Sequence, residues 1–267
     1  MGNYLLTIAY DGSGFHGWQK QASQKTVQGH LEQTFSRLFD TDIQLNGTSR
    51  TDAGVHALGQ RASFEADLGI PTDRLARVMN NALCGREDGS FALSPIRIVE
   101  AVEVPSGFHA RFDSKGKKYV YRFLPGEEDI FRRNYVYHLP DRRLDTEAMD
   151  AAAGFLTGTM DFKSFEAAGG TPRKTTVRTI YEARVRNSES AQGWPEDEIL
   201  FEIAGDGFLY NMVRIIAGTL VEVGQGKRDP GELREIIEAR DRTRAGHTAP
   251  PYGLYLKEVY YEDRTEE

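Results

Sequence analysis

The alternation of short strand-like runs with amphipathic helical runs constrains the fold of this chain more than any other feature. A first strand is expected at LLTIAY (5–10), and the segment 26–39 follows with Thr26 as a helix N-cap. Apolar residues of this segment recur at helical spacing, on one face, as Val27, Leu31, Phe35 and Leu38. A strand at 60–66, a second helix at 71–83 and a strand at 96–104 continue the alternation.

The second half of the chain repeats this scheme. Strands are expected at 119–124, 179–186, 198–205 and 254–261, and helices at 145–158, within 208–226 and at 229–240. Two similar halves of this kind predict an α+β protein in which helices cover one face of a mainly antiparallel sheet. We expect halves at 1–105 and 106–267 that share a continuous sheet, because no low-complexity linker separates them. The uncovered face and the seam between the halves would form a cleft.

The composition is typical of a globular protein, with 39% hydrophobic and 27% charged residues among 267. No apolar run reaches the roughly 20 residues that a membrane span requires, and the N-terminus lacks a basic lead and a small-residue cleavage site. These features predict a cytoplasmic protein without a membrane partner. The single cysteine, Cys84, excludes an internal disulfide framework and a multi-cysteine metal site.

The charge of the chain bears on a nucleic-acid partner in two opposite ways. The net charge of −7 by itself argues against such a partner. However, basic residues cluster at 111–122, 131–135 and 172–178, whereas acidic residues collect at 194–198 and in the C-terminal tail. Such a chain can present a basic groove on one face while the rest of its surface is acidic.

The run GSGFHG (12–17) matches the glycine spacing of a dinucleotide-binding loop directly after a strand. That loop must open a helix whose N-terminus binds the pyrophosphate, yet residues 18–20 intervene and the helical period begins near Val27. A nicotinamide-dependent oxidoreductase is therefore disfavoured. The six histidines include no i, i+4 pair with a companion acid, so the sequence shows no ligand set for a zinc hydrolase.

The run GTSRTDAGVHALGQ (47–60) places one carboxylate, Asp52, between Arg50 and a Gly-Val-His run. An aspartate near a glycine turn commonly caps backbone amides, and this is one interpretation of Asp52. The other is a functional acid. A nucleophilic dyad with His56 lacks support, because the sequence holds no G-x-S-x-G serine and Cys84 ends an expected helix. We interpret His56 as a surface or loop-packing residue.

The run SRTDAGVHALGQ (49–60) resembles the catalytic loop of the tRNA pseudouridine synthase A (TruA) family, whose motif reads G-R-T-D-A-G-V-H-A with the aspartate as catalytic residue. Six further blocks are similar to family blocks and follow in the family's order: YDGSGFHGWQKQ, TVQGHLE, GFHARFDSKGKKYVYRF, GTMDFKSFEAAG, GFLYNMVRIIAGTLVEVGQGK and TAPPYGLYLKEVYY. The resemblance therefore spans nearly the whole chain. One departure is Ser49, which stands where the family usually has glycine and is expected to stiffen the loop.

The resemblance implies the pseudouridine synthase fold, with two ferredoxin-like (RRM-like) halves that form a central cleft. It also implies a homodimer that isomerises uridine to pseudouridine at positions 38, 39 and 40 of the tRNA anticodon stem-loop. The reaction breaks the bond from ribose C1′ to uracil N1, turns the base and joins C1′ to C5. No outside atom enters, so no cofactor or metal is implied. A tRNA-binding protein without catalysis is the alternative function.

Four residues acquire expected roles from the resemblance. Asp52 is the catalytic residue, and three roles stay open for its carboxylate: stabilising charge on the sugar, attacking C1′, or removing a C2′ proton. Arg214, which lies among apolar residues, is expected to keep Asp52 ionised rather than to be an ordinary surface arginine. Arg50 is expected to insert toward the stack that the flipped uridine vacates. Tyr119 is expected to pack on uracil, although strand periodicity alone does not separate it from Tyr121.

Six basic residues are expected to contact RNA phosphates, which positions the RNA without reading its sequence: Arg111, Lys115, Lys117, Lys118, Arg132 and Arg133. Each of them also has a simpler interpretation as a solubilising charge.

Overall fold

The computed structural model describes residues 1–87, 90–140, 143–170, 174–189 and 193–262. The chain divides into two compact units, the first made of Met1–Lys115 with Leu256–Glu267 and the second of Gly116–Tyr255. The first boundary thus lies ten residues after the expected end of the N-terminal half, and the C-terminal strand belongs to the first unit from Leu256 onward. In the described part of the chain, no helix combines the length and the apolar character of a membrane span.

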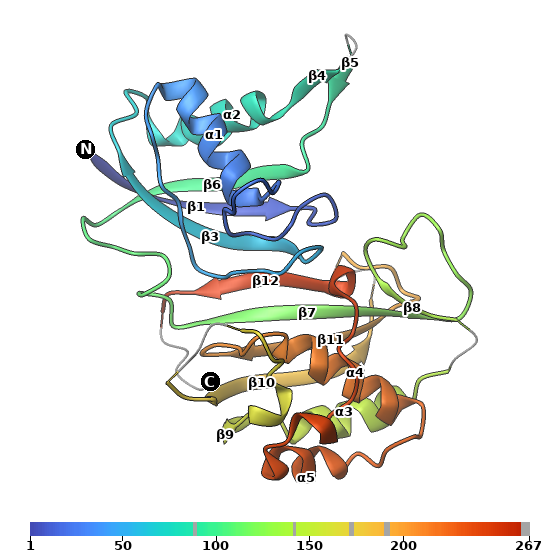
Figure 1. The fold of residues 1–267 in the computed structure, drawn as a ribbon. Coiled ribbons are helices and arrows are strands. Elements are labelled where there is room, and N and C mark those ends of the chain that lie inside the picture. Colours follow the sequence, from blue (N-terminus) through green and yellow to red (C-terminus); the bar gives the residue numbers. More distant parts are fainter. Residues whose placement is uncertain (88–89, 141–142, 171–173, 190–192, 263–267) are drawn as a thin grey trace. The chain divides into compact units, whose positions relative to one another are not determined.

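The first unit is built on an antiparallel sheet in the order β6-β1-β3 (Figure 1). Its strands are β1 (Gly2–Tyr10), β3 (His56–Ala66) and β6 (Ile96–Val104), and β3 also pairs with the short β2 (Asn46–Gly47) and with β12 (Leu254–Tyr260). Two helices, α1 (Val27–Phe39) and α2 (Thr72–Leu83), pack beside each other, and α2 packs on β6. A hairpin of β4 (Gly85–Glu87) and β5 (Ser90–Ala92) follows α2. The order β1-α1-β2-β3-α2-β6 is that of a ferredoxin-like unit.

The expected helix at 26–39 is confirmed as α1, together with its cap. The Oγ1 atom of Thr26 accepts a hydrogen bond from the amide of Gly29 at 3.3 Å, which satisfies one of the amides that have no partner inside the helix. Val27, Leu31 and Phe35 are fully buried, as their spacing predicts. Leu38, which lies in the last turn of α1, is exposed instead of buried with the other three.

The second unit is built on a sheet in the order β7-β11-β10-β9, in which neighbouring strands are antiparallel (Figure 1). The strands are β7 (Gly116–Pro125), β9 (Gly158–Asp161), β10 (Val177–Asn187) and β11 (Ile199–Gly205), and β8 (Tyr137–Leu139) pairs with β7 in parallel. The helices are α3 (Thr146–Gly154), α4 (Met212–Gly224) and α5 (Glu232–Ala239), with 3-10 turns at Lys163–Phe165, Arg242–Arg244 and Pro251–Gly253. The order β7-α3-β10-β11-α4 repeats the scheme of the first unit, and the expected α+β class is confirmed.

The two faces of the β7–β11 ladder differ in character. Residues directly opposite each other in an antiparallel pair lie on the same face. Tyr121 is paired with Phe201, and both side chains are fully buried, on the apolar face. The opposite face carries charged residues such as Lys118 and Glu202, which form an ion pair. This alternation places the side chains of Tyr119 and Tyr121 on the apolar face, because they are two residues apart.

The predicted end of the third helix is wrong. The helix expected at 145–158 ends at Gly154, and Gly158 instead begins β9, with a φ of +117°. Gly158 pairs with Ile180 of β10, so the backbone at this position takes part in the sheet instead of extending the helix. The short strands β2, β8 and β9 were not expected either, because two to four residues carry too little periodicity to identify a strand.

Candidate active site

The Asp52 loop, residues 48–55, connects β2 to β3 within the first unit. Thr48 fixes the start of this loop, because its amide donates to the carbonyl of Arg61 at 2.9 Å and its Oγ1 donates to the carbonyl of Ala110 at 2.9 Å. Both acceptors are distant from Thr48 in the sequence. The loop therefore leaves the sheet along a path that is set by long-range contacts.

A buried glutamine holds the next residue of the loop. The Oε1 atom of Gln60 accepts from the amide of Ser49 at 3.2 Å, and its Nε2 donates to the carbonyl of Ser49 at 2.7 Å. Gln60 is fully buried, so water does not compete for these bonds. Sequence reasoning missed Gln60, since a glutamine within a strand usually indicates an exposed polar position. Gln60 thus restrains this part of the loop, while the stiffening expected from Ser49 itself stays a prediction.

Two aromatic residues hold Thr51, the residue directly before Asp52. The amide of Trp18 donates to the carbonyl of Thr51 at 3.1 Å. The hydroxyl of Tyr10 lies 2.7 Å from Thr51 Oγ1, in a buried hydrogen bond. Trp18 is itself almost completely buried. Thr51 is therefore held through both its backbone and its side chain.

Two glycines of the run 12–17, Gly12 and Gly17, pack directly against the Asp52 loop. A Cβ atom at Gly12 would collide with the carbonyl oxygen of Val55. Gly17 has a φ of +87°, and a Cβ atom there would lie 2.6 Å from the carbonyl oxygen of Thr51. The first and last glycines of the spacing that resembles a dinucleotide-binding loop are thus explained by the close approach of two backbones.

His56, at the other end of the loop, is buried rather than on the surface. Its Nδ1 accepts a hydrogen bond from the amide of Gly12 at 3.1 Å, so it joins the glycine-rich run to β3. The expectation of a loop-packing histidine is confirmed.

Asp52 and Arg50 lie together on this loop. Asp52 is half-buried, and its carbonyl accepts from the amide of Val55 at 3.2 Å, which closes a turn. Arg50 is exposed. The loop thus combines a partly shielded carboxylate with a cation that reaches solvent.

Tyr119 and Tyr121 occupy β7 in the second unit, and their surroundings differ. The hydroxyl of Tyr121 donates to the carbonyl of Pro250 at 2.7 Å, and burial raises its pKa well above the ordinary tyrosine value. The ring of Tyr119 meets the ring of Phe208 edge to face, with 5.2 Å between the ring centroids. Both tyrosines are buried, but Tyr121 is completely enclosed with its hydroxyl bonded to the backbone, whereas 8% of Tyr119 is exposed. The expected contact of Tyr119 with uracil stays a prediction.

Arg214 lies in the first turn of α4 and is half-buried, so it is not an ordinary surface arginine. Its Nε donates to the carbonyl of Ala249 at 2.8 Å, and its Nη1 donates to Oδ1 of Asn211 at 2.7 Å. Asn211 precedes the helix in a left-handed conformation, with a φ of +59°. These contacts orient the guanidinium. Asp52 and Arg214 belong to different units, and their pairing stays a prediction.

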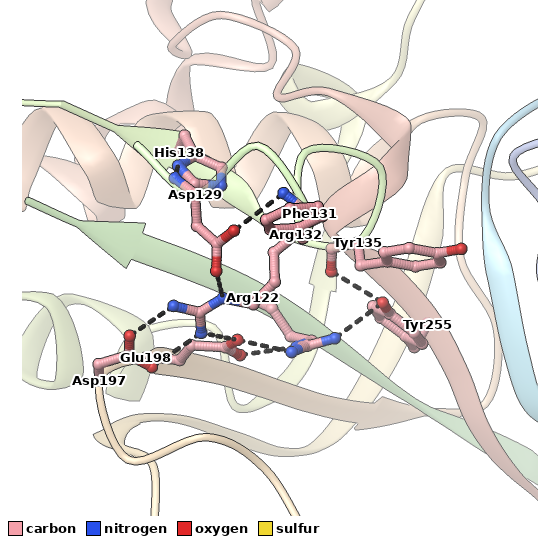
Figure 2. Close-up of polar contacts among 9 residues, drawn as sticks. All are labelled: Arg122, Asp129, Phe131, Arg132, Tyr135, His138, Asp197, Glu198 and Tyr255. Carbon is pink, nitrogen blue, oxygen red and sulfur yellow. Dashed lines mark hydrogen bonds and ion pairs between the residues drawn. The ribbon is translucent and has the colours of Figure 1, made fainter. Parts of the chain in front are cut away.

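The charged face of β7 is braced by a buried ion-pair network (Figure 2). Arg122 donates to both carboxylate oxygens of Glu198, at 2.7 and 2.6 Å, and to the hydroxyl of Tyr255 at 2.8 Å. Its guanidinium also lies over the ring of Trp194, 4.6 Å from the centroid. Because Arg122 is three residues from Tyr119, this network fixes the strand that carries Tyr119.

Two of the six basic residues that were expected to contact phosphates form ion pairs within the protein, Arg132 in this network and Lys118 in a separate cluster. Arg132 donates to Asp197 at 2.8 and 2.6 Å, with further contacts to Glu198 and Asp129, and the ion pairs raise its pKa. Lys118 pairs with Glu182 and Glu202, and its side chain is mostly buried. The structure therefore assigns Arg132 and Lys118 to ion pairs within the protein.

The remaining four candidates lie closer to solvent. Arg111, Lys115 and Arg133 are exposed, and Lys117 is half-buried. In the basic cluster at 172–178, residues 172 and 173 lie outside the described residues, as does the end of the acidic tail, 263–267.

Comparison with known proteins identifies the family of this chain. Residues 6–113 and 152–262 match the family described as tRNA pseudouridine synthase. The chain is 47% identical to a tRNA pseudouridine synthase A of Acetivibrio thermocellus over 263 residues, which cover 98% of this chain and 100% of the relative. It is 43% identical to proteins of the same name from Caldicellulosiruptor bescii and Lacticaseibacillus casei, with the same coverage of both chains. The chain belongs to the tRNA pseudouridine synthase family.

Proposed function

We propose that this protein isomerises uridine to pseudouridine at positions 38, 39 and 40 of the tRNA anticodon stem-loop. Family membership over most of the chain supports the proposal. The observation that carries it is the Asp52 loop, whose motif is held by Thr48, Gln60 and Trp18 on three sides. A carboxylate on a fixed loop suits a reaction at one atom of a flipped nucleotide, because catalysis depends on orientation within a fraction of an ångström.

The chemistry assigns the central role to Asp52. The C1′–N1 bond of the uridine breaks, the base rotates, a C1′–C5 bond forms, C5 loses its proton and N1 gains one. The ionised carboxylate acts on the sugar, either at C1′ or at the C2′ proton, while positive charge develops there. The substrate supplies every atom of the product, so the proposed reaction requires no cofactor.

Three other residues complete the proposed site. Arg214 is oriented by Asn211 and Ala249, and we propose that its positive charge keeps Asp52 ionised. Tyr119 packs on the flipped uracil, and Arg50, which is exposed, enters the space that the base leaves in the stem.

We also propose that the protein acts as a homodimer in the cytoplasm, as the family resemblance implies. One subunit would present the active site while the other holds the RNA. Sedimentation of the protein with and without tRNA tests this part of the proposal, because a monomeric complex with full activity would contradict it.

Tritium release from unmodified tRNA that carries [5-³H]uridine tests the reaction itself. The wild-type protein should release tritium, and Asp52→Asn should lose this activity while it still binds tRNA. The matched control is Asp42→Asn, which replaces an exposed acid of the same unit and should keep full activity. A tRNA without uridine at positions 38 to 40 should release nothing.

The outcomes separate the proposed enzyme from its alternative. Tight tRNA binding without tritium release by the wild-type protein would leave a tRNA-binding protein without catalysis. Release that persists in Asp52→Asn would remove Asp52 from the mechanism while leaving the reaction in place.

A further inference from the structure

Phe112 is a large apolar side chain that the fold leaves at the surface of the first unit, with 76% of it exposed. It lies in a closed turn, His109–Asp113, in which the amides of Phe112 and Asp113 both donate to the carbonyl of His109 at 3.0 Å. Oδ2 of Asp113 accepts from the amide of His109 at 2.6 Å. We call this segment the Phe112 turn.

The ring of Phe112 is held in place by neighbours within the turn. The His109 ring lies against it, with 4.2 Å between the centroids and 35° between the planes. The guanidinium of Arg111 lies 5.9 Å from the centroid, and the Arg111 amide donates to Nδ1 of His109 at 3.1 Å. A partner that binds this ring therefore loses little side-chain entropy, because the ring is already oriented.

The Phe112 turn and the Asp52 loop share an anchor, the backbone of Ala110. Its carbonyl accepts from Thr48 Oγ1 at 2.9 Å and from the hydroxyl of Tyr261 at 3.0 Å, and its amide donates to Ser63 Oγ at 2.9 Å. Thr48 begins the Asp52 loop, so the position of the Phe112 turn is set relative to that loop within one unit. A ligand on Phe112 is thereby placed on the same rigid support as Asp52.

The charges near Phe112 favour an anionic partner. Arg111 and Lys115, on the same segment, are both exposed, and the one acid between them, Asp113, is bonded to the His109 amide of the turn. The other highly exposed phenylalanine among the described residues, Phe131, is 84% exposed on a loop of mixed charge, where the exposed acids Glu127 and Glu128 accompany the exposed Arg133 and Arg132 is paired with acids. An exposed aromatic ring beside cations is the arrangement that binds unpaired bases of single-stranded nucleic acid, because the ring stacks on the base and the cations contact its phosphate.

We propose that Phe112 stacks on an unpaired base of the tRNA substrate while Arg111 contacts an adjacent phosphate. This inference rests on the proposed function for the identity of the RNA. It adds a contact outside the four residues of the proposed site, and it makes the Phe112 turn a positioning element that holds the stem-loop relative to Asp52.

Equilibrium binding of an unmodified tRNA transcript, measured at several salt concentrations, tests the proposal. Phe112→Ala should weaken binding by roughly tenfold, the loss typical of one base stack, without changing the salt dependence. Phe112→Trp should restore affinity, because it keeps an aromatic face. Arg111→Ala should lower the salt slope by about one unit, as the loss of one phosphate contact predicts. Phe131→Ala is the matched control for removing an exposed ring and should bind as the wild type does.

A fluorescent base provides a readout that a general loss of structure would not reproduce. A series of tRNAs would each carry 2-aminopurine at a different unpaired position of the anticodon loop. At one of these positions, the wild type and Phe112→Trp should quench the fluorescence of the base, whereas Phe112→Ala should not. In turnover, Phe112→Ala should raise KM with little change in kcat, since stacking contributes equally before and during the reaction.

Three results would overturn the stacking proposal: wild-type affinity for Phe112→Ala, failure of the Trp variant to restore binding, or loss of the dimer in sedimentation without a change in RNA affinity. The last result would instead identify the ring as a contact with a second copy of this chain. These outcomes differ from failure of the proposed function, in which the wild type binds tRNA but releases no tritium.

Discussion

Single residues decide the shape of the Asp52 loop, some through their size and some through buried hydrogen bonds. Gly12 lets two backbones approach where any side chain would collide, and Gln60 binds both polar backbone atoms of Ser49. The sequence shows the motif around Asp52, but it does not show the contacts of Gly12 and Gln60 that hold the loop in place. Gln60 follows Asp52 closely in the chain, but only the folded structure shows that it is buried.

Gly12→Ala tests the role of close packing. The new Cβ would collide with the backbone carbonyl of Val55, which cannot rotate away as a side chain would. We expect a loss of about 1–3 kcal/mol in the free energy of unfolding, and about a hundredfold loss of activity if Asp52 moves by an ångström. The control is Gly14→Ala, where a Cβ would meet nothing within 4 Å, with an expected change below about 0.5 kcal/mol. Urea unfolding and tritium release measure both effects, and equal behaviour of the two variants would contradict the packing argument.

Tyr261→Phe tests the shared anchor at alkaline pH. Burial raises the pKa of Tyr261 to about 12, so the folded protein favours the neutral phenol. The resulting stability is present in full below pH 10, the ordinary tyrosine value, and is lost as the pH rises from about 10 through 12. Over this window the wild type should lose on the order of 2 kcal/mol more than Tyr261→Phe. Urea unfolding from pH 9 to 12 measures the difference, and parallel curves for the two proteins would rule out this role for Tyr261.

At the scale of elements, α1 and β7 illustrate two levels of predictability. The helix α1 and its Thr26 cap follow from local spacing and were expected. The charged face of β7 depends on Glu198, which is 76 residues from Arg122 in the chain, so no local pattern reveals the pair. For the same reason, the sequence suggested phosphate binding for Lys118 and Arg132, whereas the fold brings acids to both.

Glu198→Gln tests how strongly this network holds β7. The substitution leaves Arg122 mostly buried without its counter-charge, and we expect a loss of about 3–5 kcal/mol in the free energy of unfolding. Asp197→Asn is the control, because the side chain of Asp197 is 55% exposed and its pair with Arg132 should contribute no more than about 1 kcal/mol. Denaturant unfolding compares the two variants. A loss for Glu198→Gln as small as that for Asp197→Asn would mean that water reaches the Arg122 pair.

For the whole molecule, the main consequence of the fold is that the C-terminal strand returns to the unit that contains the N-terminus. Residues from Leu256 onward belong to the first unit, where β12 lies beside β3 and Tyr261 bonds to Ala110. Integrity of the Asp52 loop thus depends on residues about two hundred positions away in the sequence.

A stop codon after Tyr255 tests this dependence, since it removes the C-terminal strand and leaves residues 116–255 intact. In hydrogen exchange, those amides of β3 that do not bond to β1 should lose protection, and the amides of the Asp52 loop should exchange faster. The amides shared by β10 and β11 are the internal control and should keep their protection, because both strands lie wholly within the second unit. Unchanged exchange in β3 would show that the first unit is complete without β12.

Local sequence patterns were sufficient to predict the α+β class, the helix α1 with its cap, and the paired strands β10 and β11. They were also sufficient to identify the family motif around Asp52. These features depend on periodicity and on residues that are adjacent in sequence. Tertiary structure alone decided that the glycine-rich run packs on the Asp52 loop, that Gln60 is buried, that Lys118 and Arg132 are paired, and that β12 returns to the first unit. The glycine, Lys118, Arg132 and β12 contacts join residues far apart in the chain, and the burial of Gln60 depends on how the folded first unit packs around it, so no local sequence pattern reveals them.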